Sequence, residues 1–77
     1  MNDWQIQQRA AAGIKKEFPV GTRVLIVYIN ENGYKQDCVG GTGTVDYVDD
    51  MGQVDVCMDD GQSVCVCRYY GDQFHKI

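Results

Sequence analysis

The residues of this sequence with the widest range of chemistry are its four cysteines, Cys38, Cys57, Cys65 and Cys67. Thiolates can coordinate zinc, form disulfides or act as nucleophiles. Structural zinc sites usually hold cysteine pairs separated by two to four residues. From Cys57 onward this chain has only Cys-x7-Cys and Cys-x-Cys spacings. We therefore expect free thiols and no cofactor, with Cys57, Cys65 and Cys67 as the candidate ligands should a metal or redox function exist.

The remaining residues with catalytic potential form no recognisable constellation. His75 is the single histidine, and no serine or carboxylate stands at a spacing that would activate it. The glycines of residues 40–43 lack the Lys-Ser/Thr pair and the following helix of a phosphate-binding loop. A chain of 77 residues also leaves little volume for an enclosed substrate cavity. The sequence predicts a protein that is not an enzyme.

Tyrosines and aspartates are the candidate binding residues. Tyr34, Tyr69 and Tyr70 fall in predicted loops or strand ends, where exposed aromatic rings supply contact area at low entropic cost. The competing interpretation places Tyr28 and Tyr47 in the core and the other rings partly under a helix. Four aspartates occupy predicted turns, where they either satisfy backbone amides or form an acidic surface for a partner: Asp49, Asp50, Asp59 and Asp60.

The formal net charge of −4 is unevenly distributed. Residues 37–77 carry a balance of −6, whereas residues 1–36 carry +2. A negative field repels phosphate backbones at long range, so we expect a protein partner rather than nucleic acid. The alternative is a nucleic-acid-binding surface built from the basic residues of the first half: Arg9, Lys15, Lys16, Arg23 and Lys35.

We expect a short N-terminal helix at residues 1–17. Asn2 or Asp3 can cap it, and Pro19 disfavours helical backbone at the residue before it. Apolar residues recur at four-residue spacing, which predicts one stripe that packs on the rest of the chain or on a second copy. The stripe consists of Ile6, Ala10, Ile14 and Phe18.

Short apolar segments separated by Asp-Gly turns predict strands at residues 24–29, 42–48, 53–58, 64–66 and 73–76. Alternation directs Val54, Val56 and Met58 inward, and the hairpin register then places Cys57 opposite Ser63. Cys57, Cys65 and Cys67 should share the outer face. We expect a single, mostly β domain over residues 1–77, with a five-stranded antiparallel SH3-like barrel at residues 18–77.

Glycines and turn residues recur in a distinctive pattern in five segments: residues 18–24, 41–45, 49–54, 58–61 and 72–77. Over residues 15–77 this pattern resembles a family of small phage- and plasmid-associated proteins catalogued as a domain of unknown function. Its resemblance to KOW-type and other SH3-like barrels is looser. This resemblance implies an accessory protein of a mobile genetic element. A more specific form of this expectation is an inhibitor of a host nucleic-acid-handling or defence complex.

Together these observations favour a non-enzymatic module that acts through protein contacts. A KOW-like nucleic-acid-binding barrel is the alternative, and a thiol–metal or redox protein is a second one. The chain begins without the basic and apolar segments of a signal peptide, and no apolar run reaches the ~18 residues that a membrane span needs. We expect a cytoplasmic protein without membrane contact, with self-association through the helix as a further possibility.

Overall fold

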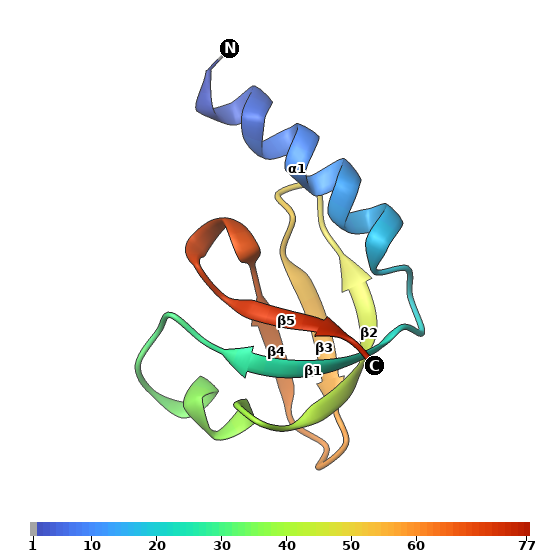
Figure 1. The fold of residues 1–77 in the computed structure, drawn as a ribbon, viewed down its shortest axis with the longest axis vertical. Helices are drawn as coiled ribbons and strands as arrows, with labels where there is room; N and C mark the ends of the chain where they lie inside the picture. The colour runs from blue at the N-terminus through green and yellow to red at the C-terminus, as the bar shows by residue number, and fades with distance from the viewer. Residues whose placement is uncertain (1) are drawn as a thin grey trace.

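The computed structural model describes residues 2–77, apart from the side chain of Tyr34 (Figure 1). Helix α1 (Asp3–Glu17) precedes strands β1 (Arg23–Tyr28), β2 (Thr42–Val48), β3 (Val54–Met58), β4 (Ser63–Val66) and β5 (Gln73–Lys76). Two short 3-10 turns interrupt the loops, η1 (Tyr34–Cys38) and η2 (Arg68–Tyr70). The prediction of a mostly β protein with one N-terminal helix and five antiparallel strands is confirmed.

Helix α1 begins and ends at the residues that local chemistry dictates. The side chain of Asn2 accepts a hydrogen bond from the Gln5 amide at 2.8 Å, and the Gln5 side chain accepts one from the Asn2 amide at 3.3 Å. This reciprocal capping box satisfies amides that have no partner within the helix. The helix ends at Phe18 because Pro19 follows it.

The buried face of α1 differs from the predicted stripe. Ile14 and Phe18 are buried as expected, but Ile6 is 46% exposed and Ala10 is also exposed, while Gln7 and Ala11 are buried. The β2–β3 turn sets this phase, because the Gln7 side chain donates a hydrogen bond to the Met51 carbonyl at 3.3 Å and Gly52 lies against Ala11. The first turns of the helix project beyond the strands (Figure 1).

The strands pair in the order β4-β3-β2-β1-β5. Cys57 lies opposite Ser63, which confirms the predicted β3–β4 register. Among the described residues the pairings join neighbours in this order and do not join β4 to β5, so closure into a barrel stays a prediction. With 15 residues, α1 is too short to span a bilayer, and the described part of the chain contains no other helix that could do so.

Two β-bulges turn a pair of tyrosines outward. One lies between Ile26 and Tyr28 of β1, and the other between Val45 and Tyr47 of β2. An extra residue reverses the alternation of side chains beyond it. Ile29 and Val48 therefore point into the core, while Tyr28 and Tyr47 are 48% and 56% exposed. The interpretation that placed Tyr28 and Tyr47 in the core was wrong.

The core forms between the sheet and the end of α1. The rings of Phe18 and Phe74 lie 5.0 Å apart and are surrounded by valines and isoleucines of the strands. Gly43 of β2 lets β3 approach closely, since a Cβ atom there would lie 2.6 Å from a methyl carbon of Val56. Close approach rather than a positive φ therefore requires glycine at this position.

Candidate protein-binding surface

The most prominent surface feature is a pair of tyrosines on η2, the turn between β4 and β5. Tyr69 and Tyr70 are 50% and 55% exposed. Their rings meet edge to face, with centroids 5.4 Å apart and an interplanar angle of 82°. Gly71 then takes a left-handed conformation, with φ of 97°, and ends the turn. The two rings thus present a continuous aromatic edge to solvent.

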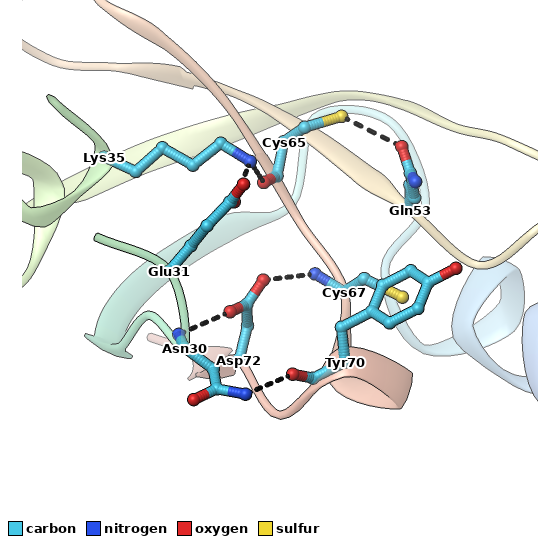
Figure 2. A pocket seen from close by; sticks show the side chains of 8 residues that line it. All are labelled: Asn30, Glu31, Lys35, Gln53, Cys65, Cys67, Tyr70 and Asp72. Carbon is cyan, nitrogen blue, oxygen red and sulfur yellow. Dashed lines mark hydrogen bonds and ion pairs between the residues drawn. The ribbon is translucent and has the colours of Figure 1, made fainter. Parts of the chain in front are cut away.

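The carboxylate of Asp72 fixes this turn to the end of β1 (Figure 2). Asp72 is buried, and it accepts one hydrogen bond from the Asn30 amide and another from the Cys67 amide, both at 2.9 Å. The Asn30 side chain in turn donates to the Tyr70 carbonyl at 2.9 Å. Three hydrogen bonds therefore hold the backbone on both sides of the tyrosine pair.

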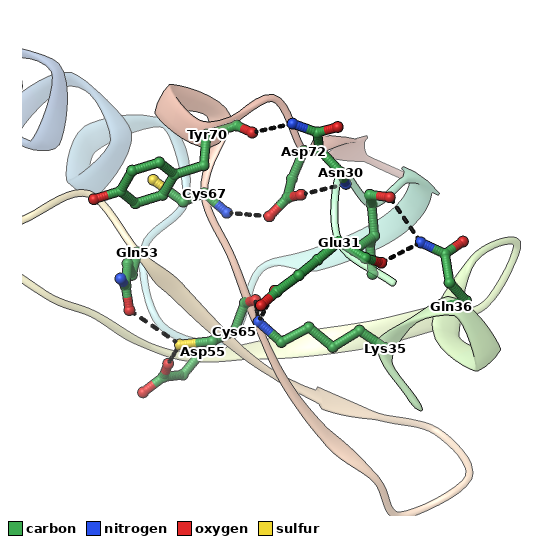
Figure 3. A network of polar contacts seen from close by, with 11 residues as sticks. Asn30, Glu31, Lys35, Gln36, Gln53, Asp55, Cys65, Cys67, Tyr70 and Asp72 are labelled. Atoms are coloured by element: carbon green, nitrogen blue, oxygen red, sulfur yellow. Dashed lines mark hydrogen bonds and ion pairs between the residues drawn. The ribbon is translucent and has the colours of Figure 1, made fainter. Parts of the chain in front are cut away.

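Below Tyr70 lies a hollow of about 250 Å³ between η2 and the loop after β1. The Lys35 ammonium on its wall bonds the Glu31 carboxylate at 2.8 Å and the Cys65 carbonyl at 3.3 Å. The Gln36 side chain holds the same loop by donating to the Ile29 and Glu31 carbonyls (Figure 3). The hollow therefore has walls fixed by hydrogen bonds, with the Tyr70 ring at its rim.

On the other side of η2, Tyr69 forms a wall of an apolar groove of about 450 Å³ between the turn and α1. Arg68 also lines this groove. Its guanidinium bonds both carboxylate oxygens of Glu17 and lies 4.9 Å from the centre of the Phe18 ring. Through the Glu17 bonds, Arg68 lowers the pKa of that carboxyl below its ordinary value. Arg68 thus ties the tyrosine turn to the end of the helix.

The four candidate aspartates do not form one surface. Asp49 and Asp50 lie on the β2–β3 turn, while Asp59 and Asp60 follow the opposite end of β3. The length of β3 puts roughly 13 Å between the two pairs. Asp49 accepts hydrogen bonds from the Met51 and Gln53 amides, and Asp60 accepts one from the Gln62 amide. Local turn chemistry therefore accounts for one aspartate of each pair.

The other two aspartates are bound to basic residues. Asp50 bonds the Lys15 ammonium, and Asp59 makes two bonds of 2.7 Å to the Arg23 guanidinium. These hydrogen bonds are the main reason that the pKa of Asp50 and the pKa of Asp59 lie below the ordinary carboxyl value. Both carboxylates already have cationic partners, which lowers the charge available to a ligand.

Ion pairs within the chain involve three of the five residues of the candidate nucleic-acid surface. Lys15, Arg23 and Lys35 each form an ion pair with a carboxylate of this chain. Arg9 and Lys16 are exposed on α1. A phosphate backbone would have to displace the neighbouring carboxylates from three of the five predicted basic residues.

The predicted outer-face cluster of cysteines is only partly correct. Cys57 is exposed and Cys65 half-buried, but Cys67 is buried, because β4 ends at Val66 and Cys67 is the cap residue of η2 rather than part of the strand. Within the described part of the chain, no three cysteine, histidine or acidic side chains are placed to hold a metal ion. Burial and a hydrogen bond to Asp55 raise the pKa of Cys65 to about 12, so this thiol stays protonated at neutral pH.

Of the predicted tyrosine contacts, the structure brings Tyr69 and Tyr70 together. The side chain of Tyr34 lies outside the described residues, so its predicted contact is not placed. Sequence reasoning missed Asp72, Arg68 and Met51, which fix or line the surface. Met51, an apolar residue in a polar turn, was the one signal available. Asp72 is one of nine aspartates and nothing in its neighbours distinguishes it.

The fold and this surface define a small, mostly β protein in which α1 and the η2 turn flank a surface with two exposed aromatic rings. The chain belongs to the family described as Domain of unknown function (DUF4314), whose model matches residues 7–77. No curated protein and no solved structure matches it.

Proposed function

We propose that this domain is a non-enzymatic protein-binding module and that the tyrosine pair of η2 is its main contact. The observation that carries the proposal is the exposure of two rings, Tyr69 and Tyr70, beside two hollows, on a turn whose backbone is held by hydrogen bonds. Tyrosine is enriched among the residues that dominate binding energy at protein interfaces. Its large ring has few rotatable bonds, so little entropy is lost on binding.

The support beneath the rings strengthens this proposal. Asp72 and Asn30 fix the turn from one side, and Arg68 fixes it from the other. A surface organised before binding loses less free energy on association than one that must be ordered by its partner. An SH3-like relationship, in which loops at one end of the sheet bind the partner, is a finer form of the same proposal.

A role as an accessory protein of a mobile element, or as an inhibitor of a host nucleic-acid-handling complex, would use this surface in a specific setting. The net charge of −4 supports an approach to a basic partner. The ion pairs at Asp50 and Asp59 favour tyrosine contacts over nucleic-acid mimicry. Charge reversal at Asp49, Asp50, Asp59 and Asp60 tests the electrostatic alternative.

The test is affinity capture from a lysate of the organism that carries the gene, followed by measurement of Kd for the captured protein. Tyr70→Ala should weaken binding by about 2 kcal/mol, roughly 30-fold. Tyr47→Ala is the matched control, because Tyr47 is equally exposed but lines neither hollow, and it should change Kd by less than about threefold. The melting temperatures of both variants verify that the fold is intact.

Two results would contradict the proposal. Binding that survives both Tyr69→Ala and Tyr70→Ala but fails after charge reversal of the aspartates would replace the aromatic contact by an electrostatic one. Salt-dependent binding of duplex DNA or RNA that is lost on changing Lys15, Lys16 and Arg23 would favour the nucleic-acid alternative.

A further inference from the structure

The loop after β1 contains the dipeptide Asn32-Gly33. An asparagine side chain can cyclise when the backbone nitrogen of the next residue attacks its carbonyl carbon. A side chain on that next residue hinders the attack, and glycine has none. Asn32 is the one asparagine of the three in this chain that precedes glycine. It is therefore the asparagine with the least steric hindrance to this reaction, unless the fold protects it.

In the folded chain both reacting groups are accessible. Asn32 and Gly33 are exposed between β1 and η1, and a Cβ atom built on Gly33 would have no other atom within 4 Å. Within the described residues, neither the Asn32 side chain nor the Gly33 amide has a hydrogen-bond partner. The Gly33 nitrogen can therefore approach the Asn32 side chain without breaking a hydrogen bond of its own.

The other two asparagines are held by hydrogen bonds. The Asn2 side chain accepts one from the Gln5 amide at 2.8 Å, and the Asn30 side chain donates one to the Tyr70 carbonyl at 2.9 Å. Each of these asparagines is followed by an acidic residue rather than by glycine. Both the local sequence and the fold therefore disfavour cyclisation at these two positions.

The dipeptide Asp60-Gly61 offers a comparison within the same chain, because an aspartate side chain can form the same ring. Here the Gly61 amide donates to the Met58 carbonyl at 2.9 Å, and the Asp60 carboxylate accepts from the Gln62 amide at 3.0 Å. Both reacting groups have partners, so the ring can close only after this turn opens. No such contacts restrain Asn32 and Gly33 within the described residues.

We propose that Asn32 is a site of spontaneous deamidation in the folded protein. The Gly33 nitrogen loses its proton to base and forms a bond to the side-chain carbonyl carbon of Asn32. The bond from that carbon to the side-chain nitrogen breaks, and ammonia leaves. Water then opens the cyclic imide at either carbonyl and gives aspartate or isoaspartate. The net reaction is the hydrolysis of one amide, so it needs water alone.

The product changes a wall of the hollow beneath Tyr70. The new carboxylate follows Glu31, in the loop where Glu31 and Lys35 form an ion pair, and it adds one negative charge to the formal net charge of −4 (Figure 3). Isoaspartate also routes the backbone through the side chain, which lengthens the chain by one carbon directly before η1. The reaction does not depend on the proposed binding role, so the two proposals can fail separately.

The test is incubation of the folded chain at neutral and mildly alkaline pH, followed by ion-exchange chromatography and peptide mapping by mass spectrometry. The chain should gain one negative charge, and the peptide that contains Asn32 should yield two products of equal mass, aspartyl and isoaspartyl. Conversion should be faster at the higher pH, because the attacking nitrogen must lose its proton. In the guanidinium-unfolded chain the rate at Asn32 should lie within roughly threefold of the folded rate, since local opening of an exposed loop costs close to zero.

Two matched variants identify the reacting residue. Asn32→Ser should abolish the added charge, whereas Asn2→Ser, which keeps a capping side chain, should leave conversion at Asn32 unchanged. Conversion in the unfolded chain but not in the folded one would overturn the inference, because the fold would then protect this loop. Formation of aspartate without isoaspartate would overturn it as well, since water rather than the Gly33 nitrogen would then be the attacking group.

Discussion

Replacement of Asp72 by alanine should be among the most destabilising single changes in this chain. The carboxylate is buried and accepts two backbone hydrogen bonds at 2.9 Å, from the amides of Asn30 and Cys67. Asp72→Ala leaves both amides without their acceptor. The Cys67 amide is buried, so leaving it without an acceptor should destabilise the folded state by the full desolvation penalty, about 1–3 kcal/mol. The Asn30 amide is only partly buried and can recover a bond to water.

The expected total is about 3 kcal/mol. A chain of this length has an unfolding free energy of roughly 4–12 kcal/mol, so the change removes a large fraction of it. The corresponding fall in melting temperature is roughly 12–24 °C. Urea unfolding followed by circular dichroism measures the loss, with Asp46→Ala as the control because Asp46 is an exposed aspartate in the β2 bulge. Its effect should stay within about 0.5 kcal/mol.

Hydrogen exchange shows which backbone amides lose protection in Asp72→Ala. In Asp72→Ala, the amides of Cys67 and Asn30 should exchange faster than global unfolding allows. The amides of β2 and β3 should exchange only as fast as the lowered global stability of the variant predicts. If Asp72→Ala costs less than 1 kcal/mol and the Cys67 amide stays protected, the carboxylate is not what anchors the tyrosine turn. The reasoning that links Asp72 to the binding surface would then fail.

Three further predictions test other parts of the structure. Gly43→Ala should cost about 2–3 kcal/mol in urea unfolding, because its methyl group would overlap Val56, and an unchanged midpoint would refute the close approach. Stability should stay constant between about pH 5 and 8 and decline as pH falls through 4, since the folded-state pKa values of Asp59 and Glu17 are lowered and their stabilisation disappears on protonation; the decline should shrink in Arg23→Gln. A thiol reagent at neutral pH should label exposed Cys57 rapidly and protonated Cys65 slowly. If Cys65 reacted as fast as Cys57, its placement in the structure would be contradicted.

The strand pattern was predictable because it depends on local chemistry. Residues 42–48 and 73–76 alternate or end at glycine turns, and the structure gives β2 and β5 these bounds. Tyr28 and Tyr47 were placed wrongly in one interpretation because a bulge inserts one residue without any signal in composition. Alternation read from Val45 points Tyr47 inward, and only the pairing with β3 reveals the reversal.

The helix and the site show a second limit of sequence reasoning. Apolar four-residue spacing favoured a buried Ile6 and Ala10, whereas the structure buries Gln7 and Ala11 instead. The phase of the helix depends on the β2–β3 turn, which is distant in sequence. Tyr69 and Tyr70 could be predicted as exposed because they precede a Gly-Asp turn. Their support by Asn30 and Asp72 could not, since it joins residues about forty positions apart.

The contacts around Cys65 and Cys67 have a consequence for the solubility of the chain. Strand β4 is an edge of the sheet, and an edge strand with free backbone groups can template the addition of another chain. Here the Lys35 ammonium bonds the Cys65 carbonyl, and the Asp72 carboxylate bonds the Cys67 amide. An incoming strand would have to displace a cation at one point of this edge and an anion at another. The side chains that shape the hollow beneath Tyr70 therefore also protect this edge against aggregation through β-sheet extension.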